Sequence, residues 1–298
     1  MPLTTYYQEL RARQARDGGF AIRPGAECRA NATAWAILAL RLTGDEDSGI
    51  EKACRRLAAW QLDDGSVPVF PDHRKAIWPT PLAVLAWHGS GAHRSNQERA
   101  VKFLLEHSGD HPARKPDSPL GHNPELRGWP WVLGTHSWVV PTSLAILALE
   151  LRGLGGNGRV AEAVKMLVDR RLSRGGWNYG NTTVYGTELE PLPDTTGVAL
   201  NALRNHVEDS VVQSSIAYLS RRVEKIRTPI SLGWGLLGLS AWGARPAGAA
   251  LWAEETLGRQ QSTGAFNTDQ LALLLVAAST TGGLLSAVRK EVASAVKT

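Results

Sequence analysis

Two kinds of hydrophobic pattern alternate along this chain. The first places apolar residues on one face of a helix and charged residues on the other, as expected for helices at a protein surface. Segments of this kind are 6–16, 50–61, 96–107, 159–172, 209–223 and 247–261. The second kind is apolar on nearly all sides and rich in alanine, which predicts helices buried among their neighbours. The alternation predicts six pairs of helices, each an amphipathic helix followed by a buried one.

The buried segments share a repeated phrase. Its clear copies are 31–40, 78–87, 140–149 and 194–203, and weaker copies are 230–239 and 267–276. Each clear copy has threonine at its third position and alanine at its sixth. Because a threonine hydroxyl can cap free backbone amides, we expect the threonine to begin the helix.

A second phrase, Gln-x-x-x-Gly-x-apolar, stands at the turns. Its copies are 14–20, 61–67 and 260–266, and 171–177 has arginine in place of the glutamine. We expect the glutamine to bond to the backbone of a neighbouring helix end and the glycine to allow a left-handed turn. The terminal apolar residue would fill the gap between layers. These roles are structural.

Six pairs with buried second members predict an all-α fold, an (α/α)6 toroid in which an outer ring of helices surrounds an inner ring. An open solenoid is the alternative, although it would expose the inner helices more evenly. We expect residues 1–298 to form a single domain, with a long rim loop at about 107–141 and a last helix at about 284–296.

Composition narrows the class of protein. With 43% hydrophobic and 20% charged residues, the 298-residue chain can bury a large core. Cys28 and Cys54 have no metal-ligand spacing, so neither a disulfide framework nor a metal site is expected. No apolar run approaches 18 residues, which favours a cytoplasmic protein without a transmembrane segment. The net charge of +5 is spread along the helices, which argues against nucleic acid. Contact with a membrane surface and the oligomeric state remain open.

The turn phrases resemble the QW repeats of squalene-hopene cyclase and related terpenoid cyclases. The alternating helices are similar to prenyltransferase and squalene-oxidase repeats, which also occur in protein prenyltransferase β chains. The resemblance covers about 6–280 and implies a toroid that holds an isoprenoid substrate in a central cavity, without a cofactor. Related toroids also occur in glycan-cleaving enzymes and lanthionine cyclases, so the fold by itself leaves the activity open.

The chain departs from the motifs that carry activity in these families. Class II terpene cyclases have an Asp-x-Asp-Asp-Thr-Ala phrase, and the matching stretch is 191–196. Its central acid falls on Pro193, which cannot donate a proton, and only Asp194 and Thr195 match the family. The Asp-x-Cys pair that holds zinc in protein prenyltransferases is missing, as are the Cys-His-Gly and Cys-Cys elements of lanthionine cyclases.

Asp194 is the first candidate for chemistry. It stands at the start of a predicted inner helix, where its plain role would be to cap the helix. A general acid needs a raised pKa, which burial or a neighbouring carboxylate can supply. Glu188 and Glu190 are close in sequence, so the three carboxylates are expected to share a proton if the loop folds over the cavity mouth.

Aromatic and polar residues gather before the inner helices, which places them on one rim of the ring. Indole faces can stabilise a cationic intermediate or stack on a sugar, and their plain role is to seal the barrel. Asp72 would orient His73 as a base, although a surface loop is the simpler interpretation. The candidate substrate contacts are Trp129, Trp131, His136, Trp138, Trp177, Tyr179, Tyr185, Trp78, Asp72 and His73.

These observations predict a terpenoid-cyclase-like protein that binds a hydrophobic isoprenoid and, if it is an enzyme, cyclises or isomerises it by acid catalysis. The first alternative is a non-catalytic toroid that binds a lipid or a protein through the same rim. The second is a glycan-active enzyme with two carboxylates facing a tryptophan-lined groove.

Overall fold

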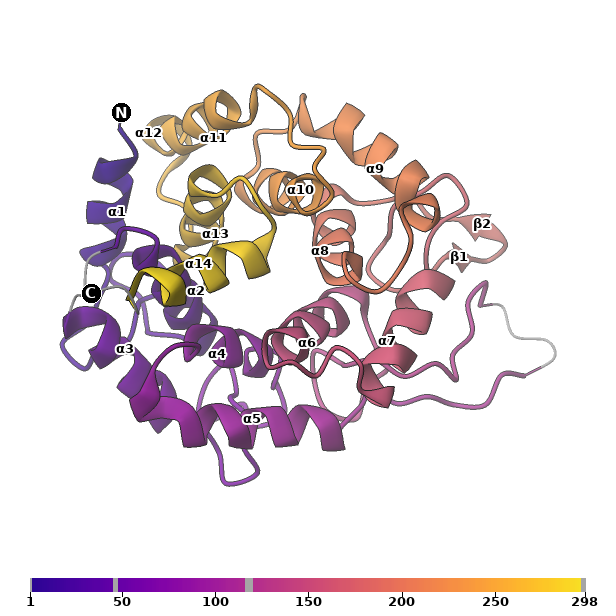
Figure 1. Ribbon diagram of the computed structural model, residues 1–298, viewed down its shortest axis with the longest axis horizontal. Helices are drawn as coiled ribbons and strands as arrows, with labels where there is room; N and C mark the ends of the chain where they lie inside the picture. Colours follow the sequence, from indigo (N-terminus) through magenta and orange to yellow (C-terminus); the bar gives the residue numbers. More distant parts are fainter. Residues whose placement is uncertain (1, 45–47, 116–119, 296–298) are drawn as a thin grey trace.

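The computed structural model describes residues 2–44, 48–115 and 120–295. Two concentric rings of helices form the molecule, as Figure 1 shows. The inner ring consists of α2 (Ala30–Arg41), α4 (Thr80–Ala86), α6 (Val139–Leu151), α8 (Pro193–Leu203), α10 (Pro229–Ala241) and α13 (Thr268–Ser279). These helices are buried along most of their length because apolar residues occupy nearly all of their faces. The predicted (α/α)6 toroid is confirmed.

The outer ring is built from the amphipathic segments, which bury one face each. It consists of α1 (Leu3–Arg11), α3 (Ser48–Ala59), α5 (Arg94–Glu106), α7 (Gly158–Asp169), α9 (Asp209–Val223) and α11 (Ala249–Gly258). The smaller elements are η1 (Gly91–His93), α12 (Gln260–Thr263) and a hairpin of β1 (Thr183–Val184) and β2 (Thr187–Glu188). The hairpin pairs Thr183 with Glu188 in antiparallel register. No helix stands between α5 and α6 in the described part of the expected rim loop.

The ring closes between its last and first inner helices. α13 packs against α2, and Asn31 of α2 donates a hydrogen bond of 3.1 Å to the Asp269 carboxylate of α13. The backbone amide of Thr268 also donates to the carbonyl oxygen of Ile22 at 2.7 Å. The open solenoid is therefore excluded, and side chains from both ends of the chain contribute to the same inner ring.

The glutamine phrases fasten each turn to the next outer helix. The Gln61 amide donates to the carbonyl oxygens of Gly65, at 2.9 Å, and Asn96, at 2.8 Å. Gln14 makes a matching pair of bonds, and Arg171 instead donates to a serine hydroxyl of α9. The expected bond to a neighbouring backbone is confirmed for Gln14 and Gln61, whereas Gln260 donates to the side chain of Glu9 on α1 at 3.4 Å.

The threonines of the inner phrase do a different job from the one expected. None of α2, α4, α6 and α8 has a side-chain cap at its start. In three copies the threonine hydroxyl instead accepts a hydrogen bond from the backbone amide of the last residue of the turn phrase, and in the copy at 140–149 it accepts from the backbone amide of Trp129 in the rim loop. These bonds of 2.9 to 3.0 Å join Phe20 to Thr33, Val67 to Thr80, Trp129 to Thr142 and Trp177 to Thr196. The predicted capping role is wrong. The hydroxyl instead satisfies a buried backbone amide, which would be costly to leave without an acceptor.

Gly65 provides a test of the turn geometry. Its φ is +91°, and a Cβ atom there would lie 2.4 Å from the carbonyl oxygen of Arg99. Gly153 has a similar φ of +73° but open space around it. Gly65→Ala is expected to lower the free energy of unfolding by about 3 kcal/mol or more, and Gly153→Ala by about 1 kcal/mol. Equal losses in urea unfolding of the two variants would contradict the fastening role of this turn.

α14 (Leu284–Ala295), the yellow helix in Figure 1, packs against α13 on one side of the ring. The backbone amide of Leu284 donates to the side-chain oxygen of Asn201 at 2.9 Å, near the carboxyl end of α8. Leu284, Ala287 and Val288 are buried. Position 296, where this helix was expected to end, lies outside the described residues. Among the described residues, no helix combines the length and apolar character needed to cross a membrane.

Candidate functional site

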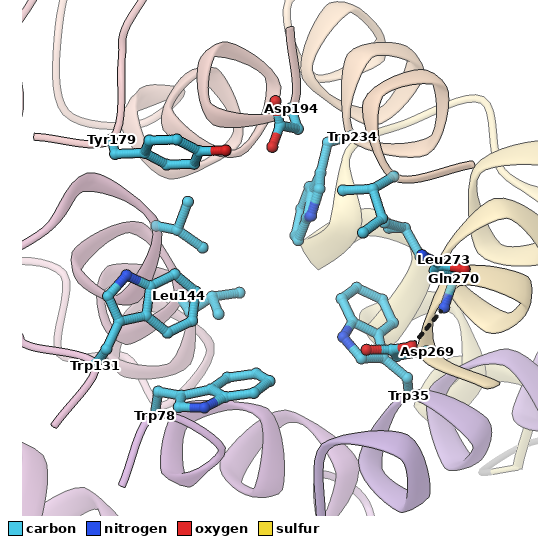
Figure 2. Close-up of a pocket in the computed structure, with 12 residues that line it drawn as sticks. Trp35, Trp78, Trp131, Leu144, Tyr179, Asp194, Trp234, Asp269, Gln270 and Leu273 are labelled. Atoms are coloured by element: carbon cyan, nitrogen blue, oxygen red, sulfur yellow. Dashed lines mark hydrogen bonds between the residues drawn. The ribbon is translucent and has the colours of Figure 1, made fainter. Parts of the chain in front are cut away.

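A cavity of about 210 Å³ lies inside the ring, at the amino-terminal ends of the inner helices (Figure 2). Aromatic and aliphatic side chains make up most of its wall, and two carboxylates interrupt it. The lining residues are Trp35, Trp78, Trp131, Val140, Leu144, Tyr179, Asp194, Ile230, Trp234, Asp269, Gln270 and Leu273. Because the lining residues lie in or just before the first turns of the inner helices, the cavity lies on the side of the ring that carries the loops.

A simple rule of helix geometry selects most of these residues. Val140, Asp194, Ile230 and Asp269 are each the second residue of an inner helix. Side chains four residues apart lie on the same face of a helix, one turn along. This spacing leads from those positions to Leu144, Trp234 and Leu273, and on α2 from Asn31 to Trp35. α6, α10 and α13 therefore contribute residues of their first two turns to the cavity wall, and α2 and α8 contribute one residue each.

The sixth copy of the phrase has a register different from the expected one. Aligning 267–276 with the other copies places Asn267 at the position of Asp194, whereas the structure places Asp269 there. Asn267 is the helix cap, and its backbone amide donates to the Gln270 side chain at 3.0 Å. The sequence signal was present, since Thr268-Asp269 begins α13 as Pro193-Asp194 begins α8.

Asp194 is a partly buried carboxyl group without a cationic partner in the described part of the chain. Burial raises its pKa above the usual value for aspartate. Backbone amides of Asp194 itself and of Thr195 donate to it and oppose this shift. Because no counter-charge holds the carboxylate, Asp194 retains a proton at higher pH than a surface aspartate does.

Asp269 is the second carboxyl group of the cavity wall. Burial raises its pKa as well, while the amides of Gln270 and Asn31 and the charge of Arg29 oppose the rise. The Asn31 side chain donates to one carboxylate oxygen at 3.1 Å, and the backbone of Gln270 donates to the other at 3.0 Å. These two bonds fix the orientation of the Asp269 carboxylate. Asp194, in contrast, accepts no hydrogen bond from a side chain in the described part of the chain.

The aromatic wall consists of two edge-to-face indole pairs and one tyrosine. Trp78 and Trp131 have ring centroids 5.2 Å apart, and Trp35 and Trp234 lie 5.6 Å apart, both pairs with an interplanar angle of 77°. Tyr179 is half exposed, and Figure 2 shows its hydroxyl directed toward the side of the cavity that holds Asp194. The expected contacts Trp78, Trp131 and Tyr179 therefore do line the cavity, and Trp35 and Trp234 were missed.

Two of the expected indole contacts are structural. Trp129 is buried and donates its ring N–H to the carbonyl oxygen of Leu104 at 2.9 Å. Trp177 is fully buried and donates to the carbonyl oxygen of Leu167 at 2.7 Å. Both indoles tie the loops to the outer helices and contribute no surface to the cavity.

The other residues of the loops lie around the cavity lining. His136 is exposed, and its ring lies tilted against that of Trp138, with centroids 4.2 Å apart and an interplanar angle of 37°. Burial of its ring and the nearby charge of Arg170 lower the pKa of His136. Asp72 and His73 are exposed in the loop before α4. None of these four expected side chains is part of the described cavity lining.

Tyr185 and the two glutamates occupy the surface near the hairpin. Tyr185 is 94% exposed. Glu188 accepts hydrogen bonds from the backbone and hydroxyl of Ser173, and the backbone bond lowers its pKa most. Glu190 pairs with Arg174 at 2.8 Å. The structure therefore does not bring these carboxylates together with Asp194, because both are bound to the turn at 173–174.

Known structures share this fold at low sequence identity, and no family model matches the chain. A variant of type II terpene cyclase MstE from Scytonema, in complex with geranylgeranyl dihydroxybenzoate (substrate), is 12% identical with a TM-score of 0.60, covering 96% of this chain and 97% of that one. The α-1,6-mannanase GH76A of Salegentibacter sp. HEL1_6, an inactive variant in complex with α-1,6-mannotriose, is 11% identical with a TM-score of 0.60, covering 93% and 99%. Haptocorrin in complex with Cbi is 15% identical with a TM-score of 0.53, covering 94% and 66%. The chain has the helical toroid fold of these proteins.

Proposed function

We propose that this protein binds an isoprenoid in its central cavity and rearranges it by acid catalysis, with Asp194 as the proton donor. One observation carries the proposal: a partly buried carboxyl group, without a cationic partner among the described residues, faces a wall of four indoles and a phenol. A raised pKa keeps the carboxyl group protonated at higher pH than an ordinary aspartate paired with a cation, so its proton is present for transfer to an alkene. Indole faces stabilise the positive charge that results.

The size of the cavity limits the part of the ligand that fits. A cavity of about 150 Å³ lined by apolar side chains holds a benzene molecule. The volume of about 210 Å³ therefore suits one end of an isoprenoid, roughly one or two isoprene units, rather than a long chain. The remainder of a longer substrate would extend out of the cavity past Tyr179, whose side chain is half exposed.

The proposed reaction returns every proton that it uses. The Asp194 carboxyl transfers its proton to the less substituted carbon of the terminal double bond, which leaves a carboxylate and a tertiary carbocation. A second double bond attacks the cation and closes a ring, and the Trp78–Trp131 and Trp35–Trp234 pairs face the charge. Loss of a proton from a neighbouring carbon forms the new alkene. Asp269, oriented by Asn31, accepts that proton as a carboxylate in this scheme. Exchange with solvent then returns a proton to Asp194 and removes the one on Asp269, so the net reaction is an isomerisation.

The likeness to a terpene cyclase with bound substrate supports the proposal at the level of the fold. The mannanase likeness supports a second candidate, a glycan-active enzyme, because two carboxyl groups face the same cavity. The aliphatic side chains Val140, Leu144, Ile230 and Leu273 offer nothing to sugar hydroxyls, so the isoprenoid explains more of the wall.

A turnover assay in deuterium oxide tests the proposal. The full-length protein is incubated with geraniol, farnesol and geranylgeraniol, and products are separated by gas chromatography and mass spectrometry. We expect a cyclised isomer that carries one deuterium at the protonated carbon. If α-1,6-mannotriose is hydrolysed instead, the glycan-active alternative is correct. If the protein binds an isoprenoid but forms no product, the first alternative, a non-catalytic lipid-binding toroid, is correct.

A further inference from the structure

The ionisable groups of the cavity wall are all of one sign. Asp194 and Asp269 both line the cavity, whereas none of its described lining residues is a lysine, an arginine or a histidine. A buried carboxylate normally pairs with a cation, because the desolvation of an unpaired charge is costly. The wall itself therefore offers no positive charge to balance the two carboxylates when they ionise.

One cation acts on the wall from outside it. Burial raises the pKa of Asp269, and the charge of Arg29, just before α2, is among the effects that oppose the rise without cancelling it. The guanidinium of Arg29 is engaged elsewhere, since its Nη2 donates to Glu27 at 3.1 Å and its Cζ lies 4.5 Å from the ring centroid of Phe70. No charged side chain of the described residues shifts the pKa of Asp194. Arg29 therefore does not replace a cation in the cavity.

Indole faces are the second feature of the wall that attracts a cation. The Trp78–Trp131 and Trp35–Trp234 pairs stand on opposite sides of the cavity, as Figure 2 shows. The rings of Trp78 and Trp234 are seen nearly edge-on in this view, each with one face turned toward the middle of the cavity. The face of an indole carries the negative part of its quadrupole and attracts ammonium ions better than the ring of tyrosine or phenylalanine does. Carboxyl groups and indole faces thus line the same space.

The size and the apolar surface of the cavity select the kind of cation. Its volume is about 210 Å³, and a trimethylammonium group is about as large as benzene, which fits an apolar cavity of about 150 Å³. The methyl groups of such an ion can pack against Leu144 and Leu273 without hydrogen bonds. A primary ammonium group has three N–H donors to satisfy, and most of this wall has no acceptor for them. A quaternary ammonium ion therefore fits the wall better.

We propose that the cavity binds a small molecule with a trimethylammonium head, a second class of ligand beside the isoprenoid. The head lies between the indole pairs, and the carboxylates of Asp194 and Asp269 provide the opposite charge. The rest of the molecule extends out of the cavity past Tyr179, whose side chain is half exposed. No bond forms or breaks in this binding, so the proposal does not depend on the proposed reaction.

Calorimetric titration of the full-length protein with choline, and with its neutral isostere in which carbon replaces the nitrogen, tests the site. We expect saturable binding of choline, roughly tenfold or more tighter than binding of the isostere. Trp78→Leu and Asp194→Asn should each weaken choline binding about tenfold and affect the isostere much less. Asp72→Asn is the matched control, because Asp72 is an exposed aspartate outside the described cavity lining, and its variant should bind choline normally.

Circular dichroism verifies the fold of each variant. The proposal is overturned if choline shows no saturable binding, if the isostere binds as tightly as choline, or if both cavity variants keep the original affinity for choline.

The pH dependence of choline binding separates this site from the proposed catalysis. Burial raises the pKa of Asp194, and the carboxylate attracts a cation, whereas the neutral acid does not. Choline affinity should therefore increase as pH rises through this pKa, while turnover of an isoprenoid should decrease. Asp269 acts with the same sign. Of the helices packed against α8, α6 and α10 line the cavity with uncharged side chains only, and α9 carries Tyr218, whose pKa is raised mainly by burial.

The two proposals fail separately. Choline binding that weakens or stays constant with rising pH would contradict the site and leave the turnover result untouched. Absence of turnover together with tight choline binding would contradict only the catalysis. Octyltrimethylammonium identifies the source of the head group, because tighter binding than that of choline indicates a ligand with a hydrocarbon tail, and equal binding indicates a free small ion.

Discussion

Asp194→Asn is expected to lower turnover of the isoprenoid by about 10²- to 10⁴-fold, the usual contribution of a general acid. The amide keeps the size of the side chain but cannot donate a proton to an alkene. Affinity for the substrate should change little, since the indole pairs that hold it are untouched. Steady-state kinetics of the variant beside Glu188→Gln check this, because Glu188 is bound to Ser173 outside the cavity lining and its variant should retain full activity. Equal loss in both variants would contradict the role of Asp194.

The same substitution has a pH signature. Burial raises the pKa of Asp194 in the folded chain above its unfolded value, so the folded state binds the proton more tightly. Stability from this group is therefore fully present below the unfolded pKa and is lost as pH rises through the folded pKa. Asparagine does not ionise and avoids that loss. The free energy of unfolding of Asp194→Asn, relative to the original protein, should rise with pH, and activity of the original protein should fall as pH rises through the same range.

Trp177→Ala is expected to lower the free energy of unfolding by about 3–5 kcal/mol. The indole is fully buried, and its N–H bonds to Leu167 at 2.7 Å, so truncation leaves both a void and an unpaired carbonyl. Trp131→Ala should cost much less stability, because this side chain is only partly buried at the cavity wall. It should instead weaken isoprenoid binding about tenfold, roughly 1.4 kcal/mol.

Urea unfolding and ligand titration of both variants separate the two roles. Because Trp177 and Trp131 are the same residue type, differences in unfolded-state exposure largely cancel. If Trp131→Ala lost stability as severely as Trp177→Ala and bound the ligand normally, the division of the indoles into structural and cavity groups would be wrong.

The ring was predictable because its signals are periodic. Apolar faces with helical spacing define each element, and α9 matches the expected 209–223. Closure was favoured because the inner segments are apolar on all sides. The pairing of Asn31 with Asp269 across the closure was not predictable, since it joins residues 238 apart in the sequence.

The cavity was harder to predict because identical residue types have different fates. Trp35 and Trp234 sit within apolar phrases and were read as core, although the four-residue spacing from the second helical position directs them inward. Trp129 and Trp131 are two residues apart, yet the first seals a loop and the second lines the cavity. Glu188 is close to Asp194 in sequence, but its bonds to Ser173 hold it at the hairpin. Such outcomes depend on loop conformation, which local patterns do not specify.

A crystal structure of Asp194→Asn with a bound isoprenoid tests the central claim most directly. The slow variant should retain its substrate, and the terminal double bond should lie against residue 194, between the Trp78–Trp131 and Trp35–Trp234 pairs. Density for the hydrocarbon anywhere else, or a cavity that excludes geraniol at saturating concentration, would contradict the account.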